Sequence, residues 1–190
     1  RGLGDVYKRQ VISFTQFLPY SYTVKSSLYA GITNSTSLDG ASINFSVVTA
    51  TFDNLISIAK SRGTLEKVSL RLLANSLTYG EEWKDNQYIQ SKHYRQLLQM
   101  TPKEVLALVD RKDVEKTLAN LTAYRKEANN NFVYSIFNRP VAFYSATALD
   151  GINIRRVNNS DILEISYTSA DPGITQKTVS ILIDELIKAY

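Results

Sequence analysis

Residues 161–190 read DILEISYTSA DPGITQKTVS ILIDELIKAY, and this stretch decides the fold. Its first part alternates apolar and polar residues, which predicts a strand with one buried face. Asp171 is then placed to cap a helix, and Pro172 suits the first helical position, where a missing N–H costs nothing. The helix is predicted from apolar residues at helical spacing. These residues are Val179, Leu182, Ile183, Leu186 and Tyr190.

Strands are predicted at both ends of the chain. Residues 151–157 and 161–168 flank a turn-forming segment, Asn158-Asn159-Ser160, and so predict a hairpin. Residues 22–30 alternate in the same way and stop at Gly31, before a polar loop over 33–40. Strands so far apart must meet in one sheet. We therefore predict an α+β fold, with a small mixed or antiparallel sheet built from both ends and several helices inserted between its strands.

Two helices are predicted directly after the first loop. An apolar stripe runs over residues 48–59 and stops near Ser61-Arg62-Gly63. Thr64 is predicted to cap the second helix, which directs Leu65, Val68, Leu72 and Leu73 toward a core. Residues 79–86 are polar and interrupt the pattern.

Further helices are predicted before the hairpin. Residues 88–100 are predicted to form a short, weakly amphipathic helix. Thr101, Pro102 and Glu104 then give a helix start signal, with Thr101 as the cap and Glu104 completing a capping box. The next helix begins near Asp113 and runs past Phe132 along one apolar side. The charged residues around it, among them Arg111, have mixed signs and are interpreted as a solvated face. Asn138-Arg139-Pro140 ends the helical region.

The two ends of the chain carry separate predictions. Residues 1–10 resemble translated sequencing-adapter DNA, so we treat them as a non-native segment. Without their three basic residues and one acidic residue the net charge falls from +4 to +2, which argues against a nucleic-acid partner. Residues 11–19 are apolar but too short for a membrane span, which needs about twenty residues. They are predicted to be the remnant of a first span, with a loop or edge strand as the alternative. Residues 20–190 form the domain, predicted to be truncated because no stop signal follows the last helix.

A search for chemical motifs predicts no catalytic residue, no cofactor and no metal site. The chain has no Cys, which excludes disulfides and thiolate chemistry. His93, the one histidine, is predicted to be a packed or surface residue. The alternative is a soluble hydrolase or sugar-binding protein that uses His93 and the many aromatic residues. The paired acidic residues Glu81-Glu82 and Asp110/Asp113 are interpreted as solvated charge.

A basic pair lies on the predicted hairpin. Arg155 and Arg156 could hold an anionic group, but a surface pair of this kind more often faces nearby carboxylates. Asp161 and Glu164 are the candidates across the turn.

Two segments together resemble the Wzz-type chain-length determinants, also called polysaccharide co-polymerases. The first is Lys60-Ser61-Arg62 followed by Leu65-x-x-Val68, and the second is Ile165 to Pro172, a strand leading to Asp171-Pro172 at the start of a helix. Their order and spacing carry the resemblance, which extends over most of residues 17–190. The chain departs from the family at Thr175, where an alanine is frequent.

The resemblance implies a non-enzymatic domain in the periplasm, anchored in the bacterial inner membrane by flanking spans. Such a domain assembles into a homo-oligomer and contacts a polysaccharide polymerase and the growing glycan. It regulates the chain length or export of an O-antigen, capsule or exopolysaccharide. The alternative that the resemblance leaves open is an adaptor that activates a polysaccharide-associated tyrosine kinase, and an outer-membrane exporter is a further candidate partner.

Overall fold

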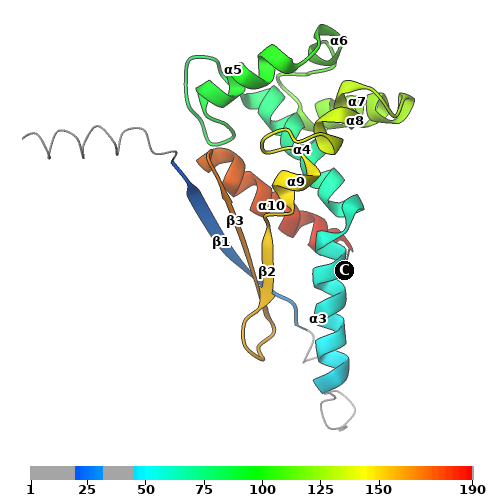
Figure 1. Ribbon diagram of the computed structural model, residues 1–190, viewed down its shortest axis with the longest axis vertical. Coiled ribbons are helices and arrows are strands. Elements are labelled where there is room, and N and C mark those ends of the chain that lie inside the picture. The colour runs from blue at the N-terminus through cyan, green and yellow to red at the C-terminus, as the bar shows by residue number, and fades with distance from the viewer. Residues whose placement is uncertain (1–19, 32–44, 190) are drawn as a thin grey trace, which may run out of the picture.

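The computed structural model describes residues 20–31 and 45–189. Within them, three strands form one antiparallel sheet in the order β1-β3-β2 (Figure 1). The strands are β1 (Tyr22–Tyr29), β2 (Asn153–Arg156) and β3 (Ile162–Ser169). The central strand comes from the C-terminal half and pairs with β1 from the other end of the chain. The predicted α+β class and the sheet built from both ends are therefore confirmed.

The sheet register separates a buried face from a more polar one. Tyr22 lies opposite Ser169 and Ile154 opposite Ile165. Leu163 and Ile165 are fully buried, as the alternation predicts. On the other face the hydroxyls of Thr23 and Thr168 are 2.8 Å apart, a cross-strand pair that stabilises the same register.

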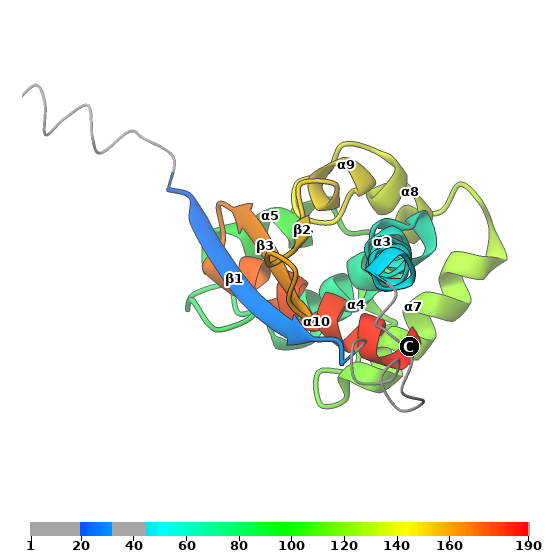
Figure 2. The ribbon, with the colours of Figure 1, turned by 90° about the horizontal axis from the view of Figure 1, so that it is seen from below.

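Eight helices lie within the described residues, and α4 is the centre of their packing. It contacts α10, which lies along the sheet, and also α3, α7, α8 and α9 (Figures 1 and 2). The bounds are α3 (Phe45–Lys60), α4 (Arg62–Tyr79), α5 (Ser91–Met100), α6 (Lys103–Leu106), α7 (Val114–Glu127), α8 (Phe132–Asn138), α9 (Ala146–Leu149) and α10 (Pro172–Ala189).

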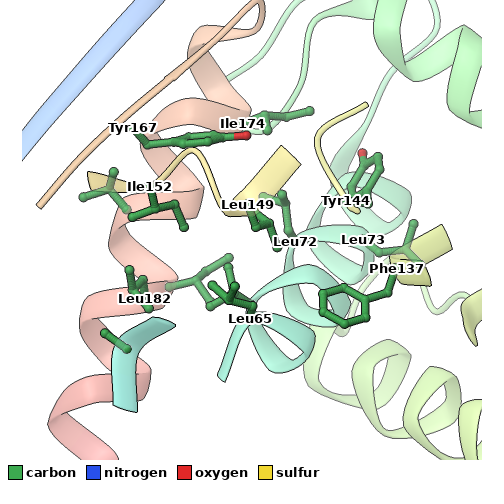
Figure 3. Packing of buried hydrophobic residues seen from close by; sticks show 14 of the residues in the cluster. Leu65, Leu72, Leu73, Phe137, Tyr144, Leu149, Ile152, Tyr167, Ile174 and Leu182 are labelled. Atoms are coloured by element: carbon green, nitrogen blue, oxygen red, sulfur yellow. The ribbon is translucent and has the colours of Figure 1, made fainter. Parts of the chain in front are cut away.

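The hydrophobic core lies between the sheet and these helices. Leu72 of α4, Leu149 of α9 and Leu182 of α10 are fully buried and belong to one cluster (Figure 3). A buried leucine truncated to alanine typically costs about 2–5 kcal/mol, so these contacts dominate the stability of the domain. The predicted stripe of α10 is confirmed at Leu182 and Leu186, both buried.

The prediction that Thr64 caps α4 is wrong. The helix begins three residues earlier, at Arg62, and Ser61 is its cap. The Ser61 Oγ accepts a hydrogen bond from the backbone N–H of Thr64 at 3.2 Å. Because Ser61 alone separates α3 from α4, it must end one helix and begin the next, and its extended backbone (ψ 145°) orients the hydroxyl for that purpose.

The predicted capping box at Thr101 is also wrong. The Thr101 hydroxyl donates to the carbonyl of Leu97 at 2.7 Å, and so it stabilises the C-terminal end of α5. Pro102 occupies the cap position without a side-chain hydrogen bond, and α6 is a single turn. The Leu97 carbonyl also accepts from Thr101 N at 3.0 Å, so the hydroxyl reinforces the end of α5 and is not available to cap the next helix.

The single helix predicted from Asp113 past Phe132 is two helices. Asp113 does cap α7, accepting from the N–H groups of Glu115 and Lys116 at 2.9 and 3.1 Å. The helix ends before the asparagine run, however, and Asn131 caps α8 by accepting from Tyr134 N at 2.9 Å. Asparagine side chains compete for backbone hydrogen bonds, and this explains the break inside an apolar stripe.

Several predictions fall on residues that the structure does not describe. These are the adapter-like segment 1–10, the apolar segment 11–19, the loop over 33–40 and the contribution of Tyr190. Over residues 20–31 and 45–189, no helix combines the length and apolarity that crossing a membrane requires.

Alkaline pH should test the packing of Tyr167. Burial raises the pKa of Tyr167 from 10.0 to about 12. The folded chain therefore holds the proton of the Tyr167 phenol more tightly than the unfolded chain. The stabilisation that the buried phenol gives to the fold is fully present below pH 10 and is lost as the pH rises toward about 12. Urea midpoints at pH 8 and pH 11 should therefore differ less for Tyr167→Phe than for the wild type. Tyr20→Phe, at an exposed position, should behave like the wild type, and an equal result for both variants would contradict the account.

Candidate functional site

The carboxylate of Asp171 is the centre of the candidate site. It is completely buried at the start of α10. Oδ1 accepts a hydrogen bond from Ile174 N at 3.1 Å, and the Asp171 carbonyl accepts from Thr175 N at 2.9 Å. The predicted cap, with Pro172 in the first helical position, is confirmed. A buried carboxylate is costly unless it is well bonded, so the second oxygen decides whether this arrangement is stable.

The second oxygen of Asp171 reaches a segment about 80 residues earlier in the chain. Oδ2 accepts from the backbone N–H of Gln90 at 2.8 Å and from His93 Nδ1 at 2.7 Å. The Nδ1–H must donate, because an ionised carboxylate can only accept. One buried side chain therefore connects the first turn of α10 to the first turn of α5. This explains why α5 begins at Ser91, although the sequence pattern predicted a helix from residue 88.

Hydroxyl groups complete the turn around Asp171. Ser169 Oγ accepts from Asp171 N at 3.2 Å and lies 2.7 Å from Thr175 Oγ1. Thr175 Oγ1 donates to the Asp171 carbonyl at 2.6 Å. An alanine at 175, which is frequent in the family that the sequence resembles, would lack this hydroxyl. Thr175 therefore adds hydrogen bonds between the end of β3 and α10.

Gly173 permits the close approach of this turn to the preceding loop. A Cβ at this position would lie 2.7 Å from the backbone carbon of Tyr88 and 3.0 Å from Ile89 N. Real Cβ atoms do not approach backbone atoms so closely. The glycine is therefore required by packing against the loop backbone.

The loop that receives α10 is held by its own side chains. Asn86 Oδ1 accepts from Tyr88 N and Ile89 N at 2.9 and 3.1 Å, and its amide donates to Tyr79 O at 2.8 Å. Asp85 Oδ1 accepts from Ser91 N at 2.8 Å at the start of α5. The sequence showed only a polar interruption here, whereas the structure contains a well-bonded Asx turn.

Arg111 fixes the same loop from the other side. Its guanidinium donates to the carbonyls of Leu77 and Gly80 at 2.9 and 2.6 Å, and to the Tyr94 hydroxyl at 2.6 Å. Sequence reasoning assigned Arg111 to a solvated face. No local signal identified its role, because all three acceptors come from elements more than fifteen residues away in the chain.

His93 is a packed residue, as predicted. It is 11% exposed at its side chain, bonds Asp171, and meets the Phe143 ring edge-on with the centroids 5.0 Å apart. Phe143 has a φ of 72°, an uncommon conformation for an aromatic residue. Burial raises the pKa of the neighbouring Tyr144 well above its usual value, so its phenol stays protonated. The arrangement can hold two helices together; its described contacts assemble no nucleophile on His93.

The acidic pairs considered in the sequence have separate structural roles. Glu81 and Glu82 are exposed, while Asp113 caps α7. Hydrogen bonds from Lys112 N and from the Lys116 ammonium lower the pKa of Asp110. In the part of the chain that the structure describes, no group of His, Cys, Asp and Glu residues could hold a metal ion.

The hairpin arginines bond within the hairpin. Arg155 forms the predicted ion pair with Glu164, at 2.7 Å. Arg156 donates to the backbone carbonyls of Asn159 and Ser160 at 3.0 and 2.7 Å, and its guanidinium carbon lies 4.2 Å from the centroid of the Phe52 ring. The pair therefore stabilises the turn and its contact with α3.

The first of the two segments that carry the resemblance spans the α3–α4 junction and the start of α4, and the second runs from β3 to the first residue of α10. Leu65 and Val68 are buried on α4, and α4 contacts α10, which Asp171 and Pro172 begin (Figure 3). The polar parts of the signatures remain apart. Lys60, Ser61 and Arg62 form the α3–α4 junction at one end of α4, whereas Asp171 bonds the start of α5, which follows the other end.

Comparison with protein-family models, curated proteins and solved structures finds no match.

Two glycines at the same helical position should respond in opposite ways to alanine. Gly63 and Gly173 are each the second residue of a helix, but a Cβ on Gly63 would meet nothing within 4 Å. Gly63→Ala should raise the free energy of unfolding by up to about 1 kcal/mol, because alanine loses less backbone entropy. Gly173→Ala should lower it by about 1–3 kcal/mol through overpacking. Chemical denaturation of both variants checks this, and equal effects would contradict the described loop contact.

Proposed function

We propose that this chain is the periplasmic domain of a Wzz-type polysaccharide co-polymerase. The observation that carries the proposal is the pair of signature segments, Lys60 to Val68 and Ile165 to Pro172. Its support from the fold is that Leu65 and Val68 of the first segment lie on α4, which packs against α10, and α10 begins at Pro172 of the second segment. Asp171 adds to this support because its carboxylate has a role beyond that of a local cap.

The proposed mechanism is assembly rather than bond chemistry. A co-polymerase domain must present a defined surface to its copies, to the polymerase and to the glycan, and the sheet covered by α10, which packs on α4 in turn, can supply it. In this role the domain is anchored in the bacterial inner membrane by spans on either side and lies in the periplasm. It limits the length, or assists the export, of a surface polysaccharide.

An apolar surface at one edge of the sheet fits a contact between copies. Tyr29 and Ile187 are exposed by 62% and 60%, and they border a cleft of about 130 Å³. The cleft is lined by Leu28, Tyr29, Ala30, Leu55, Leu163, Leu186 and Ile187. Exposed apolar residues that cluster in this way are typical of protein–protein contacts. β1 is also an edge strand, which supports a homo-oligomer in which this edge is covered.

Genetics in the source bacterium tests the proposal. Deleting the gene should change the length distribution of a surface polysaccharide on a gel, and the intact gene should restore it. The complete reading frame should encode about twenty apolar residues on each side of this domain. A Tyr29→Asp/Ile187→Asp variant should not restore the distribution, because charge at the apolar edge opposes assembly. Trp83→Asp, which changes an 88% exposed aromatic residue in the loop before α5, is the matched control and should restore it.

Two results would contradict the proposal. One is a deletion strain whose polysaccharide lengths match those of the parent. The other is a complete reading frame that encodes a protein with no membrane-spanning segment.

A further inference from the structure

A cleft of about 330 Å³ opens beside the junction of α3 and α4. The cleft is shallow and open to solvent, so it suits one unit of an extended ligand rather than an enclosed small molecule. One wall comes from the end of α3 and the start of α4, and the other from α8 and α9. The lining residues are Lys60, Arg62, Leu65, Phe137, Ala146, Thr147 and Asp150. Two of the polar signature residues, Lys60 and Arg62, therefore line one concave surface.

The first wall carries two positive charges that are not neutralised locally. Across residues 20–31 and 45–189, neither Lys60 nor Arg62 forms an ion pair with a carboxylate. Arg62 is held in place, because its guanidinium donates to Asn138 Oδ1 and lies 5.2 Å from the centroid of the Phe137 ring. A fixed guanidinium beside a free ammonium is suited to bind a carboxylate.

The opposite wall carries groups that bind hydroxyls. Thr147 and Asp150 are exposed there, and no cation pairs with the Asp150 carboxylate in the part of the chain that is described. A wholly anionic ligand, such as phosphate or an acidic peptide, would be repelled by this carboxylate. A ligand with one carboxylate and several hydroxyls can satisfy both walls, because its hydroxyls donate to Asp150.

Positive charge continues onto the adjacent face of α4. A second cleft of about 320 Å³ is lined by Gly63, Glu66, Lys67, Leu70, Thr122, Arg125 and Lys126. Arg125 pairs with Glu66 at 2.8 Å, whereas Lys67 and Lys126 form no ion pair within the described residues. The two clefts adjoin along the chain, because Arg62 lines the first and Gly63, the next residue, lines the second. An extended ligand can contact both.

We propose that these two clefts bind a segment of an acidic polysaccharide. The carboxylate of one uronic acid residue binds Lys60 and Arg62, and its hydroxyls bond Thr147 and Asp150. The following residues continue past Gly63 toward Lys67 and Lys126. The identity of the natural ligand as a surface polysaccharide rests on the proposed function, but the site itself rests on the charges and volumes of the clefts.

Titration of the purified chain with a galacturonic acid oligosaccharide tests the site. Calorimetry at low ionic strength should show saturable binding, and a carboxyl-reduced, neutral oligosaccharide should bind at least about tenfold more weakly. Lys60→Gln should weaken binding by a similar factor, and Thr147→Trp should do so by filling the cleft from an exposed position. Lys103→Gln on α6 removes the same charge at a residue that lines neither cleft, and it should change the affinity less than about twofold. Circular dichroism should show that all variants are folded.

Several outcomes would overturn the site. These are no saturable binding to the wild type, an equal loss in Lys103→Gln, or binding of inorganic phosphate or a polyglutamate peptide as tight as that of the oligosaccharide. Failure of the site and failure of the proposed function remain distinguishable. Oligosaccharide binding together with unchanged polysaccharide lengths in the deletion strain would support the binding site and contradict the co-polymerase function. Altered polysaccharide lengths in the deletion strain without oligosaccharide binding would contradict the binding site alone.

Discussion

The buried carboxylate of Asp171 is the constraint on which the arrangement of the helices depends. A desolvated charge must be surrounded by donors, and the three donors come from two distant segments: Ile174 N in α10, and Gln90 N and His93 Nδ1 at the start of α5. Satisfying one side chain therefore fixes the position of α10 against the loop before α5. The packing of Gly173 on Tyr88 and Ile89 follows from this approach.

From that point the rest of the core is built around α4. The loop before α5 follows α4 directly, so its attachment to α10 sets the distance between the two helices. Leu65 and Val68 then pack at the other end of α4. The sheet closes the same core, because β3 leads straight into Asp171 and carries β1 with it. The Ser61 cap and the exposed cations beside it project from this framework, and this gives the α3–α4 junction a defined surface.

The sequence predicted those features that depend on local periodicity. The strand alternation of 161–168, the stripe of α10, the cap at Asp171 and the hairpin with its Arg155–Glu164 pair are all confirmed. Wrong predictions came from polar residues that can act in either direction along the chain. Thr101 closes the helix before it, Ser61 takes the place of Thr64, and Asn131 divides a predicted single helix.

The candidate site was predictable only in part. Asp171 was recognised as a cap, but its bonds to Gln90 and His93 could not be inferred, because no local pattern reports a contact across about 80 residues. The role of Arg111 could not be inferred for the same reason, and the sequence placed the residue on a face of mixed charge. The clefts around Lys60 and Arg62 depend on how α8 and α9 lie against the α3–α4 junction, and that is a property of the assembled core.

The central claim is that Asp171 couples α10 to α5, and hydrogen exchange in Asp171→Asn tests it most directly. Asparagine retains one acceptor oxygen and places N–H donors against the donors Gln90 N and His93. The free energy of unfolding should therefore fall by about 2–4 kcal/mol. The backbone amides of Ile174 and Gln90 should both exchange faster than in the wild type. The amides of β3 should exchange faster only by the factor that the lower global stability predicts. Faster exchange at Ile174 with Gln90 unchanged, or an unaltered unfolding midpoint, would contradict the coupling and reduce Asp171 to a local helix cap.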